Sequence, residues 1–432
     1  MKNEWWSCDG GGGRPVGPGQ VIASRRSVLL TAGSLLAGWA GAGSALANLT
    51  LTDKPVHDRI MVVIFMRGGA DGLNMVVPYA ESAYYRARPT LAIAAPNDSS
   101  AKAASRTIDL NGFFGLHPSL APIHDLYSEG ALDIVHACGS NDQTRSHFEA
   151  MSTVERGAAR DHNGPASGWL ARHLAATGGN DSPLRAVAFG DTVPDALRGA
   201  PQAIAVQSLD DFTLQGGPLY EAGLREIYGG KDAIGHAGEQ TLAVLTKLRD
   251  LDPKSYKPSN NANYPKSDLG EGLRQVACLV RSNVGLEVAC LDKGGWDTHV
   301  AQGADTGWQA SLMTDLASSI RAFMDDLGPL KNRVTLVAMS EFGRRVAENA
   351  GLGTDHGRGG PVFVFGGGLK KPGVFGTWPG LAPDQLDEVG DLRVQTDYRT
   401  VLSEVLETRL GCDDTAAVFP GFVGPRLGLF QA

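Results

Sequence analysis

Apolar segments of strand length alternate with amphipathic segments of helix length along most of this 432-residue sequence. The most continuous apolar segment, 58–66, has the character of a strand that is buried on both faces. Such a strand needs helices against both faces, and helical spacing of apolar residues recurs at 273–281 and 309–327. The alternation therefore predicts an α/β fold in which helices flank a largely parallel sheet.

The expected elements are spread over the whole length of the chain. Strands are predicted at 58–66, 131–137, 184–189, 203–206, 286–291, 333–339 and 361–365, and helices at 116–129, 145–156, 273–281, 309–327 and 397–410. Residues 252–268 are rich in Pro, Asn, Ser and Lys, which predicts a polar surface loop. Because no repeat and no convincing boundary divides the chain, we expect a single domain over residues 48–432.

The N-terminal segment has the features of an export signal. Arg25 and Arg26 directly precede a mildly apolar stretch rich in Ala, Gly and Leu, which ends in the small-residue sequence Ala-Leu-Ala at 45–47. This pattern predicts a twin-arginine signal peptide over residues 1–47, recognised by the twin-arginine translocase and then removed. We therefore expect a periplasmic or secreted protein. Because the apolar stretch is short and interrupted by glycine, no stable membrane span is expected.

Charge and cysteine content narrow the range of partners and crosslinks. The formal net charge is −8 and no basic block stands out, so nucleic acid is not an expected partner. The mature chain keeps Cys138, Cys278, Cys290 and Cys412, and an oxidising destination permits disulfides. Four widely spaced thiols allow three pairings, and buried free thiols are the alternative.

Acidic and imidazole side chains gather beside the predicted strands of the second half of the chain. Asp297 and His299 follow strand 286–291, and Glu341 follows strand 333–339. Asp355 and His356 lie just before strand 361–365, and they complete the set. Open α/β sheets bind their ligands at the carboxyl ends of strands, and carboxylate oxygen with imidazole nitrogen suits a metal ion. The sequence therefore predicts a metal site, the alternatives being a turn capped by Asp297 and an ion pair between Glu341 and a nearby arginine.

Two further segments carry chemistry in the first half. After strand 58–66, the segment from Arg67 to Asp71 is glycine-rich and predicts either an anion-binding nest or a tight turn. After strand 131–137, Thr144 and Ser146 open a helix, where either hydroxyl is a candidate nucleophile or merely the N-cap. The flanking residues Arg145 and His147 are candidates for contacts to an oxyanion, whereas His117 is predicted to open a helix.

Several common enzyme signatures are missing from the sequence. It has no GxGxxG after a strand, no GxxxxGK[ST] and no GxSxG. Nucleotide binding and the serine-hydrolase elbow therefore find no support.

Five motifs occur in an order that resembles one bacterial protein family. They are Arg67-Gly-Gly-Ala-Asp-Gly-Leu-Asn74, Arg145-Ser-His-Phe148, Gly294-Gly-Trp-Asp-Thr-His299, Ser340-Glu-Phe-Gly-Arg344 and Gly353-Thr-Asp-His-Gly357. With the twin-arginine leader, they closely resemble the family numbered fifteen hundred and one among the domains of unknown function. That family is similar to the alkaline phosphatase and sulfatase clan. The resemblance implies an alkaline-phosphatase-like core and a hydrolase of phosphate or sulfate esters that uses one or two divalent metals such as Zn, Mn or Ca.

The resemblance also implies roles for individual residues. Asp297, His299 and His356 look like one complete metal site, with Asp292 as a rival for the carboxylate. In the second site, Glu341 would replace an aspartate, whereas Phe342 stands where the clan has a histidine and cannot bind a metal. The first strand ends in an arginine where the clan has a carboxylate, so that Asp71 is displaced into the loop. The nucleophile position falls at Thr144 or Ser146, and Arg67 and Arg145 would stabilise the ester oxygens.

These departures leave two functions open. The first is an exported metal-dependent hydrolase acting on a small anionic ester. The second is a catalytically eroded relative with a binding or assembly role in the cell envelope, which the phenylalanine and arginine at expected ligand positions favour.

Overall fold

A nine-stranded sheet forms the centre of the computed structural model, which describes residues 58–159, 164–178, 182–201, 203–210, 217–228, 233–387 and 389–431. The predicted signal peptide lies outside these residues. The sheet consists of β1 (Ile60–Met66), β5 (Leu132–Gly139), β6 (Ala186–Phe189), β7 (Ala203–Val206), β8 (Val288–Lys293), β9 (Val334–Met339), β10 (Gly360–Gly366), β11 (Val374–Phe375) and β12 (Thr396–Asp397). Its order is β11-β5-β10-β9-β1-β8-β6-β7, and β12 pairs with β5.

The sheet is mixed but mostly parallel. Among the described strands of this sheet, β10 alone runs antiparallel to its neighbours, β9 and β5. Met66 of β1 pairs with Lys293 of β8, and Phe65 pairs with Met339 of β9, so these three strands end together. Gly360, the first residue of β10, pairs with Cys138 near the end of β5. The loops after β1, β5, β8 and β9 and the loop before β10 therefore meet at one edge of the sheet.

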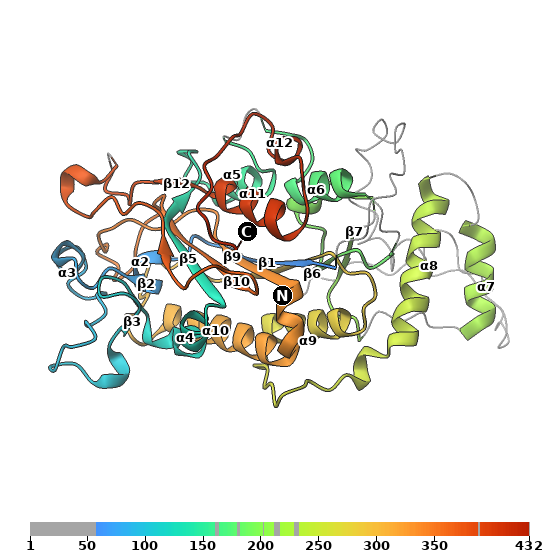
Figure 1. Cartoon of the computed structure of the whole chain (residues 1–432), viewed down its shortest axis with the longest axis horizontal. Coiled ribbons are helices and arrows are strands. Elements are labelled where there is room, and N and C mark those ends of the chain that lie inside the picture. The colour runs from blue at the N-terminus through green and yellow to red at the C-terminus, as the bar shows by residue number, and fades with distance from the viewer. Residues whose placement is uncertain are drawn as a thin grey trace, which may run out of the picture.

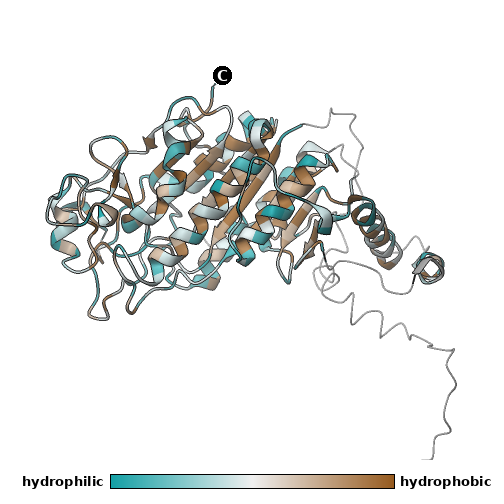
Figure 2. Cartoon of the chain, turned by 90° about the horizontal axis from the view of Figure 1, so that it is seen from below, coloured by the Kyte–Doolittle hydropathy of each residue, from teal (hydrophilic) through white to brown (hydrophobic). Residues whose placement is uncertain are grey.

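Helices cover both faces of the sheet (Figure 1). One face carries α4 (Ala121–Ser128), α9 (Asp268–Arg281) and α10 (Trp308–Leu327), and the other carries α5 (His147–Glu155), α6 (Trp169–Thr177), α11 (Tyr398–Arg409) and α12 (Thr415–Val418). Along β1, Val62 and Ile64 enter one core cluster, whereas Val63 and Phe65 enter the other. Figure 2 shows strands that are hydrophobic along their length, as a sheet covered on both faces requires. The α/β prediction is confirmed at this level.

Smaller elements surround this core. They are the helices α2 (Gly72–Met75), α3 (Ser82–Ala87), α7 (Gly217–Tyr228) and α8 (Ala233–Leu251), the strands β2 (Val76–Val77), β3 (Ile108–Asp109) and β4 (Gly115–Leu116), and the 3-10 turns η2 (Ala103–Ser105), η3 (Pro118–Leu120), η5 (Asp195–Leu197), η6 (Pro253–Ser255), η7 (Gly328–Arg333) and η8 (Pro383–Gln385). The three short strands form a separate sheet in the order β2-β4-β3. Helices α7 and α8 form a pair at the end of the molecule beyond β7 (Figure 1).

The predicted elements agree with the structure except in a few places. The sequence did not predict the helices α2, α3, α6, α7, α8 and α12 or the short strands β2, β3, β4, β11 and β12, and the helix predicted from residue 116 begins only at Ala121. It begins late because His117 caps the 3-10 turn η3, accepting a hydrogen bond from the Ser119 amide at 3.0 Å. Among the described helices, none has both the length and the apolar composition that crossing a bilayer requires. All four described cysteines are free and buried.

The polar loop 252–268 is tied to the body by one buried carboxylate. Asp326 of α10 accepts hydrogen bonds from the Tyr256 and Tyr264 hydroxyls at 2.9 Å and from the Ser259 amide at 2.8 Å. Although its composition is that of a loop, this segment is therefore fixed at three points.

Asp133 of β5 makes the stability of the fold depend on pH. Its side chain is fully buried, neither oxygen has a well-formed hydrogen bond among the described residues, and burial raises its pKa to about 7, with Glu404 adding to the rise. Since the unfolded carboxyl titrates near pH 3.9, the folded state binds more protons between these values, and stability falls as pH rises through this window. We expect the wild type to lose on the order of 4 kcal/mol relative to Asp133→Asn between pH 4 and pH 8. Urea unfolding of both proteins across this range measures the difference, and parallel profiles would contradict it.

Candidate metal centre

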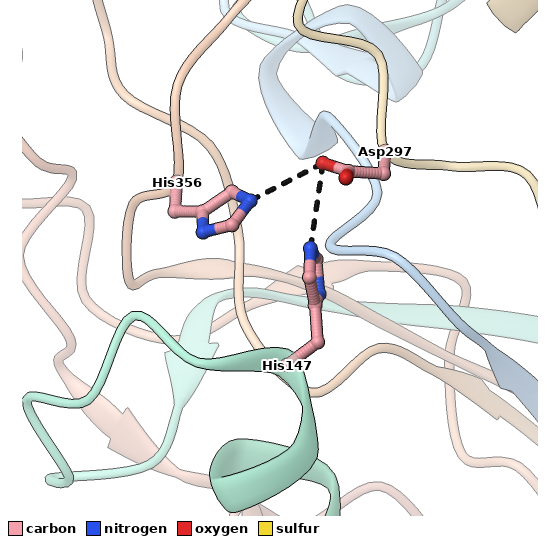
Figure 3. A group of neighbouring side chains, drawn as sticks. All are labelled: His147, Asp297 and His356. Atoms are coloured by element: carbon pink, nitrogen blue, oxygen red, sulfur yellow. Dashed lines mark hydrogen bonds and ion pairs between the residues drawn. The ribbon is translucent and has the colours of Figure 1, made fainter.

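Four side chains from two loops and the start of one helix meet at the edge where the parallel strands end. Asp297 and His299 lie in the loop after β8, His356 lies in the loop before β10, and His147 is the first residue of α5. Figure 3 shows His147 and His356 pointing toward the carboxylate of Asp297. The reversed direction of β10 is what brings His356 to this edge, because its start lies beside the ends of the other strands.

A glycine in the first loop allows the close approach that this arrangement needs. Gly68 follows β1 with φ of +117°, and a Cβ there would lie 2.7 Å from the backbone nitrogen of Asp297. Any other residue would therefore push the β8 loop away and would also adopt a strained backbone. The glycine-rich segment after β1 thus acts as a tight turn that positions Asp297.

Interatomic distances in the cluster match those around a small metal ion. Oδ1 of Asp297 lies 3.4 Å from Nε2 of His147, 3.2 Å from Nε2 of His356 and 3.0 Å from Nε2 of His299. Ligand atoms bound tetrahedrally about 2.0–2.1 Å from a zinc ion lie about 3.3 Å from each other. His147, Asp297 and His356 together form a group that could hold a metal ion.

The second ring nitrogen of each histidine faces an acceptor. Nδ1 of His147 lies 2.8 Å from the Glu341 carboxylate, and Nδ1 of His299 lies 3.2 Å from the Asp355 carboxylate. Nδ1 of His356 lies 2.7 Å from the backbone carbonyl oxygen of Arg145. These acceptors favour a proton on each Nδ1, and an imidazole that is neutral in this tautomer has Nε2 available to bind a metal ion.

The lone pairs converge in a way that calls for a cation. Nε2 of His299 lies 2.9 Å from Nε2 of His356, and both face Oδ1 of Asp297. Two lone pairs and a carboxylate oxygen at such distances repel one another unless a proton or a metal ion lies between them. The guanidinium of Arg344 meets part of this demand, because its Nη1 lies 3.5 Å from Nε2 of His299 and its Nη2 lies 2.6 Å from Oδ1 of Asp297, and a metal ion would meet the rest. Metal-bound histidines commonly donate their other N–H to a carboxylate or carbonyl, as all three do in this cluster.

Electrostatics keep the carboxylates of the cluster ionised. Burial alone would raise the pKa of Asp297, but the hydrogen bond and the charge of Arg344 lower it to about 2. Burial likewise opposes ionisation of Glu341, yet the hydrogen bond from His147 and backbone amides lower its pKa below the usual range. The same contact with Glu341 raises the pKa of His147, whereas burial lowers the pKa of His356. The site therefore carries negative charge that attracts a cation.

Glu341 and Asp355 support histidines rather than belonging to the Nε2 cluster. Oε1 of Glu341 contacts His147 and accepts a hydrogen bond from the Gly68 amide at 2.9 Å. The alternative ion pair between Glu341 and an arginine of its own segment is not formed, because Arg344 turns to Asp297. Asp355 accepts a hydrogen bond from Asn349 at 2.9 Å and faces His299. Both carboxylates thus orient an imidazole.

The candidate nucleophiles lie in the turn that opens α5. Ser146 is the N-cap of the helix, and its hydroxyl accepts from the Glu149 amide at 3.5 Å. The Thr144 hydroxyl donates to the Glu149 carboxylate and accepts from the Ser146 amide. Arg145 binds the backbone oxygen of His356 and lies 2.6 Å from the Asp391 carboxylate. The N-cap alternative is therefore realised, and Arg145 fixes the segment that carries His356.

Two other predicted site residues face away from the cluster in ion pairs. Nε of Arg67 lies 2.7 Å from Asp292, and its Nη2 lies 3.2 Å from Glu155 of α5. Asp71 lies in a buried pair with Arg88, at 2.5 Å and 2.8 Å. The structure thus brings together Asp297, His299 and His356 as the sequence suggests, and it places neither Asp71 nor Asp292 with them.

Sequence reasoning missed two features of the site. It assigned His147 to an oxyanion contact, whereas its Nε2 points at Asp297, and this nitrogen is buried without a hydrogen-bond partner among the described residues. It also did not predict that Arg344 contacts Asp297, although Nη2 of Arg344 lies 2.6 Å from Oδ1 of Asp297. The sequence did contain one indication of where His147 lies, because His147 comes directly after the turn that follows β5 and so lies at the same edge as the other residues of the cluster. Phe342 packs against the rings of both His147 and His356, with ring centroids 4.9 Å apart in each case.

The comparisons with known proteins bear on the half of the chain that contributes most of the cluster. No curated protein matches this chain. Residues 238–418, which contain Asp297, His299 and His356, match the model of the family described as "Protein of unknown function (DUF1501)".

Proposed function

We propose that this chain is an exported, metal-dependent hydrolase of phosphate or sulfate esters. The observation that carries the proposal is the convergence of three imidazole Nε2 atoms on Oδ1 of Asp297, with every Nδ1 held by an acceptor. Such a donor set suits zinc, and a site with a carboxylate also suits manganese. The motifs that resemble the family of unknown function, which is similar to the alkaline phosphatase and sulfatase clan, support the ester substrate, and the twin-arginine leader supports the export.

The exposure of the cluster supports access by a substrate. The side chains of Asp297 and His299 are 47% and 38% exposed, whereas His147 and His356 lie deeper at 20% and 17%. When bound, a divalent ion supplies a Lewis acid for an ester oxygen and lowers the pKa of water. The half-exposed carboxylate leaves that side of the centre open to solvent and to a small ester.

Positive charge beside the cluster favours an anionic substrate. Arg145 and Arg345 keep 34% and 37% of their side chains exposed, and Nη1 of Arg345 lies 4.0 Å from Asp355, the carboxylate that faces His299. Guanidinium groups stabilise the charge that develops on the oxygens of a transferring phosphoryl or sulfuryl group. Because the hydroxyls of Thr144 and Ser146 are hydrogen bonded within the turn, water is favoured over them as the nucleophile.

Metal content and ester hydrolysis together test the proposal. We expect the mature protein, purified without added metal, to contain about one divalent ion per chain by elemental mass spectrometry. It should hydrolyse 4-nitrophenyl phosphate or 4-nitrophenyl sulfate, and Asp297→Asn should lose both the ion and the hydrolysis while keeping its circular dichroism spectrum. Because the amide keeps an acceptor for Arg344 but removes its negative partner, we expect the variant to unfold at a lower urea concentration, and the comparison is made where its spectrum matches that of the wild type.

The opposite result points to the second function. A folded, metal-free protein that takes up neither Zn, Mn nor Ca would overturn the hydrolase proposal. A binding or assembly role in the cell envelope would then be the better account, with the charged cluster serving as a polar network.

A further inference from the structure

Arg344 places a fully buried guanidinium in the wall of the candidate metal centre. The residue is 1% exposed, although arginine keeps its charge under all ordinary conditions. A charge removed from water in this way is stable only when hydrogen-bond acceptors and an opposite charge surround it. The identity of those partners therefore says what the guanidinium does.

Four backbone carbonyl oxygens accept hydrogen bonds from this guanidinium. They belong to Gly68, Gly69 at 2.6 Å, Trp296 at 3.1 Å and Thr354 at 2.8 Å. They come from the loops after β1 and β8 and from the loop between β9 and β10. Two of these loops carry Asp297, His299 and His356, so Arg344 is a positioning residue that joins the loops bearing the ligands.

Asp297 is the charged partner of Arg344, and the two meet at a single oxygen. Nη2 of Arg344 lies 2.6 Å from Oδ1 of Asp297, the same atom toward which the three imidazole Nε2 atoms point. A carboxylate oxygen offers two lone pairs. One is directed to the guanidinium, which leaves one for an ion among the imidazoles.

We propose that Arg344 fills a second cation position beside the metal centre, so that the centre holds one divalent ion and the guanidinium supplies the neighbouring positive charge. Three of these oxygens, from Gly68, Trp296 and Asp297, surround Nη2 alone, and carbonyl and carboxylate oxygens are ligands that calcium and manganese ions take in proteins. In this chain a side chain of the protein itself occupies that set. The inference rests on the proposed function, because it presumes an ion among the imidazoles.

Counting bound Mn²⁺ by native mass spectrometry tests this inference. We expect the wild type to bind about one Mn²⁺ per chain at saturation. Arg344→Ala removes the guanidinium and frees the three oxygens around Nη2, so it should bind about two Mn²⁺ per chain. Millimolar guanidinium should return the variant to one ion by occupying the vacated position. Arg345→Ala is the matched control, because its guanidinium lies outside this set of oxygens, and it should keep one ion.

The possible results distinguish a failure of this inference from a failure of the proposed function. Two ions in the wild type would overturn the role of Arg344 while supporting a metal-dependent enzyme. No ion in the wild type would overturn the proposed function and this inference with it. A folded Arg344→Ala that binds one ion would show that the guanidinium does not limit the number of ions. If that variant does not fold, the wild-type count still decides between one ion and two.

Discussion

His356→Ala should lower the affinity of the mature protein for Zn²⁺ by more than about 100-fold, or about 2.7 kcal/mol, because it removes one of the converging ligands. The imidazole contributes Nε2 to the cluster at 3.2 Å from Asp297, and its Nδ1 is held by the Arg145 carbonyl at 2.7 Å. Calorimetric titration of metal-free protein with Zn²⁺ measures the change. Because the ring is largely buried against His147 and Phe342, urea unfolding of the metal-free variant is measured as well, to separate the loss of a ligand from a weakened fold.

A second histidine provides the control for this variant. His124 of α4 keeps 31% of its side chain exposed and lies near Asp125, its neighbour in sequence, rather than in the cluster. His124→Ala should bind Zn²⁺ as the wild type does. Equal affinities in the wild type and His356→Ala would show that the cluster is a hydrogen-bonded network and not a metal centre.

The sequence predicted the fold and part of the cluster for a simple reason. Buried strands read as continuous apolar runs, and parallel strands bring the residues that follow them to one edge. Asp297 and His299 could therefore be placed at this edge without a structure, and the family resemblance added His356 to them. The direction of β10 could not be predicted, because an apolar run looks the same in a parallel and an antiparallel strand. That direction, however, is what places His356 beside the other ligands.

The pairing of arginines with carboxylates could not be read from the sequence. Arg88 meets Asp71 across 17 residues, whereas Arg344 meets Asp297 across 47 residues. Arginines close in sequence to Glu341 were the obvious partners for it, yet His147, which lies 194 residues away, faces it instead. Each choice depends on which loops meet at the edge of the sheet, and local spacing carries no information about that. Asp71 was predicted to be a metal ligand and His147 an oxyanion contact because the sequence does not show which loops meet.

Asp71→Ala should destabilise the protein by about 3–5 kcal/mol, because it leaves the guanidinium of Arg88 buried without its counter-ion. Both residues are essentially inaccessible, and the carboxylate also accepts a hydrogen bond from the Gln302 amide at 2.7 Å. Urea unfolding of the metal-free protein measures the loss. Glu221→Ala, which breaks a surface pair with Arg225 and Arg249 on α7 and α8, should leave the unfolding curve unchanged and serves as the matched control.

The same variant separates support of the fold from metal binding. Asp71 holds the loop after β1 through Arg88, and its side chain does not face the imidazoles. At a temperature where Asp71→Ala is folded, it should therefore still bind about one Zn²⁺ per chain, whereas folded His356→Ala should not. If folded Asp71→Ala lost its ion while its unfolding free energy stayed at the wild-type value, Asp71 would have to be a ligand. The buried pair with Arg88 would then be a feature of the metal-free protein alone.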